Sequence, residues 1–255
     1  MKIYAIGDLH LSHSINKPMD IFGPQWKDHH HQIAANWKEK VTDKDLVLIP
    51  GDLSWAMHLE EAKADLQWID QLPGKKVLLK GNHDYWWSSI TQFRNLVKGS
   101  SLFPIQYDAA TFGQVTIGGT RLWTTPDVGI IYADPLNASQ TSGVQDDLTK
   151  GQEEKIFKRE LGRLEASLSA LSDKAELRIA MTHFPPTNES GKDTLLTRTF
   201  EKHNIDICVF GHLHSLNLPP GLTWDYVKNS IRYVLVSCDA VGFSPYFLKE
   251  IPDSP

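Results

Sequence analysis

Residues 2–10 read KIYAIGDLH, an apolar stretch that favours a β-strand and ends in two polar residues, Asp8 and His10. Its first part, Lys2–Ile6, is short and almost continuously apolar, which fits a strand buried on both faces. Five similar runs follow, at Leu46–Ile49, Val77–Leu79, Leu177–Met181, Ile207–Phe210 and Tyr233–Val236. Runs of this kind are typical of the buried strands of α/β proteins.

Helical patterns lie between these runs. In residues 59–72 the apolar positions recur every three or four residues, and Pro73 and Gly74 end the pattern. A second apolar stripe occupies residues 153–171, and residues 28–40 and 193–203 are further helix candidates. Strands that alternate with helices predict an α/β fold, and 255 residues are enough for a single domain over 1–255.

The middle of the chain has a different character. Residues 114–125 read QVTIGGTRLWTT, in which Gly118-Gly119 separates two β-favouring runs and predicts a hairpin turn. Residues 126–151 are rich in Pro, Gly, Asp, Asn, Ser and Thr. This composition predicts a long loop that serves as a lid or as an insertion facing the substrate.

The composition is that of an ordinary globular protein, with 41% hydrophobic and 22% charged residues and a net charge of −5. This acidic balance argues against nucleic acid as a partner. The apolar runs are too short to span a membrane, and the N-terminus shows no signal-peptide pattern. Cys208 and Cys238 lie in apolar runs, which predicts buried free thiols in a reducing compartment, the cytoplasm by default. The sequence predicts no oligomeric state.

Five of the apolar runs are followed by side chains that can bind a metal. These side chains belong to Asp8 and His10, Asp52, Asn82 with His83 and Asp84, His183, and His212 with His214. Ligands in open α/β sheets bind beyond the carboxyl ends of the strands, so the five groups can converge. Carboxylates, imidazoles and one amide, with no thiolate, suit manganese, iron or zinc. Glycines 7, 51, 81 and 211 would let the backbone turn sharply at four of these ends.

Each residue taken alone has an ordinary structural interpretation. Asp8 and Asp52 fit the N-cap of a helix, Asn82 fits a turn, and Asp84 fits the first turn of a helix. His58, close to Asp52, faces either a substrate or the start of a helix. It is the occurrence of five such groups in order, all at predicted strand ends, that favours a shared site.

This set of motifs resembles the calcineurin-like metallophosphoesterase superfamily, whose pattern is D-x-H, G-D, G-N-H-[DE], H and G-H-x-H. The match covers residues 8–214, and every motif is intact. The resemblance implies a two-sheet β-sandwich with helices on both outer faces, αββα, and a hydrolase that acts on phosphoesters of small molecules.

The resemblance also implies a role for each motif residue. His83 would meet the substrate as a general acid or charge stabiliser, and Asp84 would orient its ring. Seven residues would bind two divalent transition-metal ions, with manganese expected and iron or zinc as alternatives: Asp8, His10 and His214 at the first ion, Asn82, His183 and His212 at the second, and Asp52 bridging both. A hydroxide between the ions would then attack phosphorus in line.

Two departures from the protein-phosphatase branch narrow the substrate. No Asp-Arg-Gly follows Gly51-Asp52, and Asp84 stands where that branch has Glu. Both departures resemble the phosphodiesterase branch and favour a phosphodiesterase. The alternative is a phosphomonoesterase with the same site. A metal-binding scaffold without catalysis is the alternative of another class, although such a protein would be expected to lose ligands.

Further side chains near the motifs are candidates for substrate contacts. Lys17 and Arg121 could hold a phosphate group. Four tryptophans that flank the motifs could stack on a ring of the substrate, although aromatic residues more often belong to the core: Trp55, Trp86, Trp87 and Trp123.

Overall fold

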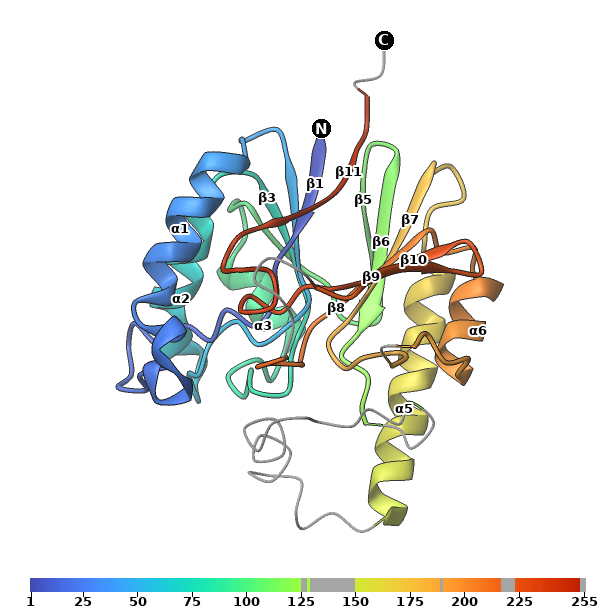
Figure 1. Cartoon of the computed structure of the whole chain (residues 1–255), viewed down its shortest axis with the longest axis horizontal. Helices are drawn as coiled ribbons and strands as arrows, with labels where there is room; N and C mark the ends of the chain where they lie inside the picture. Colours follow the sequence, from blue (N-terminus) through green and yellow to red (C-terminus); the bar gives the residue numbers. More distant parts are fainter. Residues whose placement is uncertain (125–127, 129–149, 189, 217–222, 253–255) are drawn as a thin grey trace.

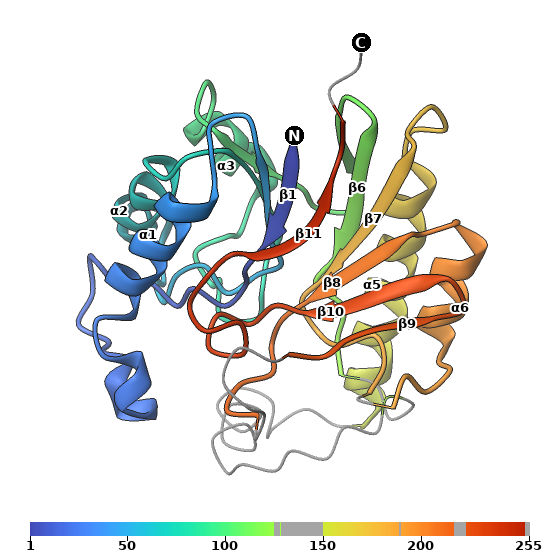
Figure 2. The same cartoon turned by 45° about the horizontal axis from the view of Figure 1, so that its top comes forward.

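The computed structural model describes residues 1–124, 128, 150–188, 190–216 and 223–252, and these residues form two mixed β-sheets. The first sheet has five strands in the order β11 (Tyr246–Glu250), β1 (Lys2–Ala5), β2 (Leu46–Ile49), β3 (Lys75–Leu78) and β4 (Leu102–Pro104). Strands β1 to β4 run parallel, and β11 joins the edge antiparallel to β1. Figure 2 shows β11 beside β1, so strands near the two chain ends pair with each other.

The second sheet has six strands and a parallel centre. Its order is β5 (Ala109–Phe112), β6 (Val115–Thr120), β7 (Leu177–Thr182), β8 (Ile207–Phe210), β10 (Ile231–Leu235) and β9 (Asp225–Lys228). The four inner strands run parallel, while β5 and β9 lie antiparallel at the two edges. Every predicted strand is therefore present, to within one or two residues at its ends.

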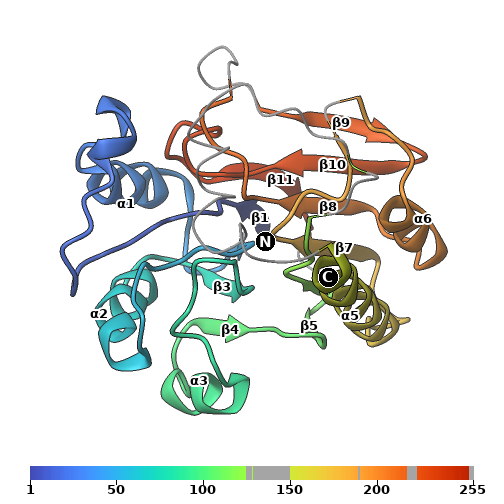
Figure 3. The ribbon, with the colours of Figure 1, turned by 90° about the horizontal axis from the view of Figure 1, so that it is seen from below.

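Helices cover the outer face of each sheet (Figures 1 and 3). The first sheet is covered by α1 (His29–Lys40), α2 (Leu59–Asp70) and α3 (Ile90–Leu96), and the second by α5 (Lys150–Ser169) and α6 (Leu195–Lys202). Two short 3-10 helices, Asp20–Phe22 and Pro24–Trp26, precede α1. The predicted sandwich with helices on both outer faces is thus confirmed. None of the helices among the described residues is both long and apolar enough to cross a membrane.

Alternating residues of the second sheet pack on two different cores, which explains its continuously apolar strands. In β8, Ile207 and Val209 join the core shared with the first sheet, whereas Cys208 and Phe210 join the core under α5 and α6. Both cysteines are buried free thiols, as predicted. Because both faces are covered, a polar residue within these strands would lose much of its hydration, and β8 carries none.

The predicted hairpin is real, but its turn lies elsewhere. Strands β5 and β6 pair antiparallel, and the turn falls at Gly113-Gln114, where Gly113 has a φ of 58°. Gly118 and Gly119 lie inside β6, where a Cβ at Gly119 would come within 1.8 Å of the Met181 carbonyl oxygen. These two glycines permit close packing and do not form the turn.

Most of the loop predicted at 126–151 lies outside the described residues. Its last two residues, 150 and 151, begin α5. The structure therefore shows that the helix predicted from 153 starts earlier than expected.

The two sheets meet at the carboxyl ends of their central strands. The Gly7 N–H donates to the Val236 carbonyl oxygen at 2.6 Å, and the Cys238 N–H donates to the Gly7 carbonyl oxygen at 3.0 Å. This bridge joins the segment after β1 to the segment after β10. The polar strand ends of both sheets are consequently brought to one place.

Candidate metal centre

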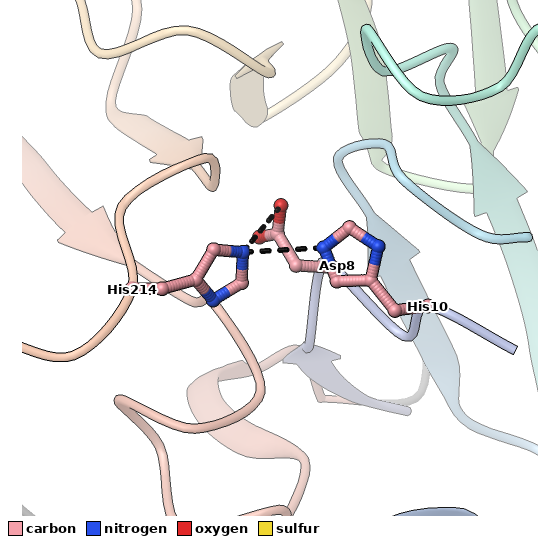
Figure 4. Close-up of side chains that lie close together, drawn as sticks. All are labelled: Asp8, His10 and His214. Carbon is pink, nitrogen blue, oxygen red and sulfur yellow. Dashed lines mark hydrogen bonds and ion pairs between the residues drawn. The ribbon is translucent and has the colours of Figure 1, made fainter. Parts of the chain in front are cut away.

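Asp8, His10 and His214 form one group of buried ligand-type side chains (Figure 4). The two imidazoles approach each other with 3.2 Å between their Nε2 atoms, and His214 Nε2 lies 3.8 Å from Asp8 Oδ1. Asp8 and His10 follow β1 of the first sheet, whereas His214 follows β8 of the second. The group therefore spans the junction between the sheets.

Asn82, His183 and His212 form a second group. Asn82 Oδ1 lies 2.6 Å from His183 Nε2 and 3.1 Å from His212 Nδ1. The other ring nitrogen of His183, Nδ1, lies 3.0 Å from the Pro50 carbonyl oxygen. This contact fixes the ring so that Nε2 points toward Asn82.

Asp52 stands between the two groups. Its Oδ2 lies 3.8 Å from His10 Nε2 and 3.4 Å from His183 Nε2. Its Oδ1 accepts a hydrogen bond of 2.8 Å from the His83 backbone N–H, which holds the carboxylate in place. The structure thus brings all seven predicted ligand residues together, with Asp52 between the two groups.

The backbone is strained where the ligand residues lie. Asp8, His10, Asp52 and His212 have φ values of 55°, 45°, 50° and 74°, in a region that non-glycine residues rarely occupy. Such conformations cost about 1–3 kcal/mol each and cluster at functional sites. Four of the twelve described non-glycine residues with a positive φ are thus ligand residues, and the junction of the two sheets holds them in these conformations.

The four glycines before the motifs act mainly through the absence of a side chain, contrary to the predicted turning role. Only Gly51 has a positive φ, of 107°. A Cβ at Gly81 would come within 2.0 Å of Asp52 Oδ1, and one at Gly211 within 2.3 Å of Asp8 Oδ2. These glycines leave the room that the two carboxylates occupy.

Burial disfavours charge throughout this cluster. It raises the pKa of Asp8 to about 6 and raises that of Asp52 well above its usual range. Burial also lowers the pKa of His10 and His183 well below the usual value, and that of His212 to about 3. Neutral imidazoles are the form that binds a metal, and nearby cations would favour ionised carboxylates.

His83 lies beside the cluster rather than in it. Its ring packs on Trp55, with 4.4 Å between the ring centroids, and lies 5.7 Å from the His10 ring. Its Nε2 is buried and has no hydrogen-bond partner among the described residues. Burial, with Lys17 as a second cause, lowers the pKa of His83 to about 3. A buried ring nitrogen without a partner is available to a ligand.

Asp84 makes contacts other than the predicted one. Its carboxylate accepts hydrogen bonds from the backbone N–H groups of Leu53, Ser54 and Gly81 and from Trp86 Nε1, over 2.8–3.2 Å. Among the described residues it makes no hydrogen bond to the His83 ring. Asp84 therefore ties the segment after β2 to the segment after β3, with three donors on its Oδ1 and the Gly81 N–H on its Oδ2.

Asp239 contacts the cluster and was not predicted. Its Oδ1 lies 2.9 Å from His214 Nδ1, and its Oδ2 accepts a hydrogen bond of 2.9 Å from the Ser215 N–H. Burial by itself would lower the pKa of His214, but Asp239 and Asp8 raise it to about 8. A sequence signal existed, since Asp239 follows the apolar run of β10 in the same way that the motif residues follow theirs.

Replacing Asp239 by alanine should weaken metal binding by about 10- to 100-fold, because partners of this kind orient the imidazole and raise its basicity. Competition with a chromophoric chelator measures the affinity. Asp239→Asn is the matched variant: it keeps an oxygen at the same place and should lose less. Equal affinity in the wild type and Asp239→Ala would contradict this role.

Other predicted residues fall into two groups. His58 is exposed and caps α2 together with Glu61, which confirms its interpretation as a helix start. Trp86 and Trp87 are core residues. In contrast, the Trp55 ring stacks on His10 with 4.7 Å between centroids, and Lys17 Nζ lies 3.2 Å from the Trp55 ring centroid. Lys17 and Trp55 therefore border the centre.

Comparison with known proteins identifies the family to which the chain is similar. A family model described as calcineurin-like phosphoesterase matches residues 1–216. The Gene 66 protein of Mycobacterium phage D29 is 36% identical over 83 residues, which are 32% of this chain and 40% of the phage protein. The chain therefore matches less than half the length of that relative.

Two solved structures are similar over most of the chain. Phosphopantetheinyl hydrolase (PptH) from Mycobacterium tuberculosis has a TM-score of 0.51 and 15% sequence identity, with 92% of this chain and 88% of that one covered. A protein of unknown function, AQ665 from Aquifex aeolicus, has a TM-score of 0.49 and 15% identity, with 96% and 95% covered. At this identity the likeness to PptH shows a shared fold.

Proposed function

The chain belongs to the calcineurin-like phosphoesterase family, and we propose that it is a binuclear metal-dependent phosphodiesterase. Family membership supports hydrolysis of a phosphoester with divalent metal ions. The position of Asp52 carries the proposal of two ions, because its Oδ2 faces His10 on one side and His183 on the other. A single carboxylate between two groups of ligands is the arrangement that a two-metal site needs.

The donor set fits such ions. Asp8, His10 and His214 each offer a ligand atom within 4.8 Å of the others, and so do Asp8, Asp52 and His183. The atoms that face one another can each donate a lone pair when unprotonated: two Nε2 atoms 3.2 Å apart in the first group, and Asn82 Oδ1 between two ring nitrogens in the second. Imidazole nitrogens and an amide oxygen are suitable ligands for divalent transition-metal ions, which would replace any protons between these atoms.

The ligands would be divided as the motifs imply. Asp8, His10 and His214 would hold one ion, Asn82, His183 and His212 the other, and Asp52 both. When bound, the ions supply Lewis-acid activation of water and of the phosphoryl oxygens. The four glycines and the strained backbone hold the ligands before any ion binds, so little rearrangement accompanies binding.

We propose that His83 stabilises or protonates the oxygen that leaves phosphorus. Its Nε2 has no partner among the described residues, and its backbone N–H is tied to Asp52, so the ring has a fixed place beside the predicted bridge. From there the neutral ring can donate a hydrogen bond from Nε2 to the departing oxygen, and it could deliver a proton only if the charge that develops on that oxygen raises the pKa of His83. Trp55 packs on both His83 and His10.

Preference for a diester is supported by the segment after Asp52. The superfamily's protein phosphatases carry an arginine in their Asp-Arg-Gly motif beyond this point. Here the segment is buried and presents the Trp55 ring to the centre. A diester carries less negative charge than a monoester and depends less on an additional guanidinium.

Hydrolysis of bis-p-nitrophenyl phosphate and of p-nitrophenyl phosphate, with Mn²⁺ and with a chelator, tests the proposal. We expect cleavage that needs the metal and a kcat/KM that is higher for the diester. A higher kcat/KM for the monoester would replace the diesterase by a phosphomonoesterase with the same centre. Cleavage that persists in the chelator would contradict the metal-dependent mechanism.

A further inference from the structure

A cavity lies where the two sheets and α5 meet. It has a volume of about 280 Å³. The segments after β3, β4 and β6 and one face of α5 line it. Its charged lining residues are Lys80, Arg121, Arg159, Arg163 and Glu160.

The cavity has more positive than negative charge. Four cations and one carboxylate among its described lining residues leave an excess of three positive charges. Glu160 is already occupied, since it accepts hydrogen bonds from Thr120 Oγ1 at 2.8 Å and from Arg163 at 2.7 Å and lies 3.5 Å from Arg159. An anion that entered the cavity would therefore find guanidinium groups that the acid does not neutralise.

Arg121 is the clearest example. Among the described residues no carboxylate pairs with it, and its guanidinium carbon lies 4.8 Å from the Trp123 ring centroid. Burial lowers the pKa of Arg121 and of Lys80. Both side chains are half-buried at one edge of the cavity, and Lys80 Nζ also donates to the Trp87 carbonyl oxygen, so an anion in the cavity could make charge-assisted contacts with them.

Two of these cations, Arg121 and Lys80, belong to segments that contact or contain residues of the second group of metal ligands. The carbonyl oxygen of Arg121 accepts a hydrogen bond of 3.2 Å from the His183 N–H. Lys80 precedes Asn82 by two residues. The cavity therefore adjoins the side of the centre where Asn82 and His183 lie.

We propose that this cavity binds a second phosphate group of the substrate while the scissile phosphoryl group occupies the metal centre. The planar fork of arginine matches phosphate oxygens in two-point contacts, and three arginines line the cavity. The proposal rests on the proposed phosphodiesterase function and narrows its substrate to phosphodiesters that carry a further phosphate, as phosphorylated nucleotides do.

A matched pair of substrates tests it. Thymidine 5′-(4-nitrophenyl phosphate) and its 3′-phosphorylated form release the same nitrophenol and differ only in the second phosphate. With Mn²⁺ and the wild-type chain, we expect the second phosphate to raise kcat/KM about tenfold or more through KM, as a charge-assisted contact of ordinary strength would. Equal kcat/KM for both substrates would overturn the second-phosphate site and leave the phosphodiesterase function standing.

Two variants, Arg159→Gln and Arg121→Gln, test whether the cavity causes the preference for the 3′-phosphorylated substrate. Arg159 is more than half exposed and makes one long contact to Glu160, so its loss leaves the fold intact. Both variants should reduce the ratio of the two kcat/KM values toward one. Arg198→Gln removes the same charge from an exposed position on α6 and should keep the ratio. A ratio unchanged in both cavity variants would place the second phosphate elsewhere and overturn the proposal.

A failure of the proposed phosphodiesterase function can be told apart from a failure of the second-phosphate site. If the wild-type chain with Mn²⁺ cleaves neither substrate, the same two compounds serve as ligands in titration calorimetry. Tighter binding of the 3′-phosphorylated compound by the wild type than by Arg159→Gln would still support the cavity as a phosphate site. Equal affinity of the wild type for both compounds would overturn it.

Discussion

Replacing Asp52 by asparagine should lower kcat/KM by about a thousandfold or more, since the charged bridge between the two ions would be lost along with the chemistry that depends on it. Asn keeps the size of the side chain and its Oδ1, so the hydrogen bond from the His83 N–H can remain. The expected effect is therefore electrostatic rather than a collapse of the centre. Steady-state kinetics on a chromogenic phosphodiester, with the metal content measured in the same preparation, provides the test.

Asp45→Asn is the matched control for this substitution. Asp45 is also buried, and it lies just before the opposite end of β2, where it accepts hydrogen bonds from the Lys2 and Thr42 N–H groups. Its replacement should affect stability and leave the metal content and turnover close to those of the wild type. Normal turnover in Asp52→Asn would contradict the proposed bridging role.

Replacing His83 by alanine should leave both ions bound and slow turnover by about 10²- to 10⁴-fold, the usual contribution of a group that assists proton transfer. The expectation follows from its position, because the ring contacts Trp55 and lies beside His10 while its Nε2 has no partner among the described residues. Metal analysis and kinetics on the same sample separate binding from catalysis.

His83→Gln distinguishes the two roles that the position allows. Glutamine keeps an N–H donor but cannot deliver a proton at neutral pH. Activity well above that of His83→Ala would identify His83 as a charge stabiliser, and equal loss in both variants would identify it as a general acid. Loss of an ion in His83→Ala would contradict the assignment of this residue to the substrate.

The sequence predicted the central strands well because both faces of the sheets are covered. All four residues of β8 are buried, so the strand is continuously apolar, and the polar residues that follow it lie beyond its end. The ligand residues could be predicted for the same reason, because they are the polar residues that follow these apolar strands. The edge strands β9 and β11 escaped prediction because they are half exposed, read DYVK and YFLKE, and carry no such run.

The remaining errors concern tertiary contacts, which no local pattern encodes. Gly118-Gly119 has the composition of a turn, yet the pair is needed where β6 approaches β7 and α5. Asp84 adjoins His83 in sequence, but three backbone N–H groups from two segments hold its carboxylate away from the ring. The contact between Asp239 and His214 depends on how β8 and β10 pair, which the motif order did not indicate.

The most direct test of the binuclear centre is a crystal structure of the protein with Mn²⁺, in which anomalous scattering locates each ion. We predict two peaks about 3.5–4 Å apart, with Asp52 between them and with Asp8, His10 and His214 at one and Asn82, His183 and His212 at the other. A single peak, or two peaks that do not share Asp52, would contradict the binuclear centre.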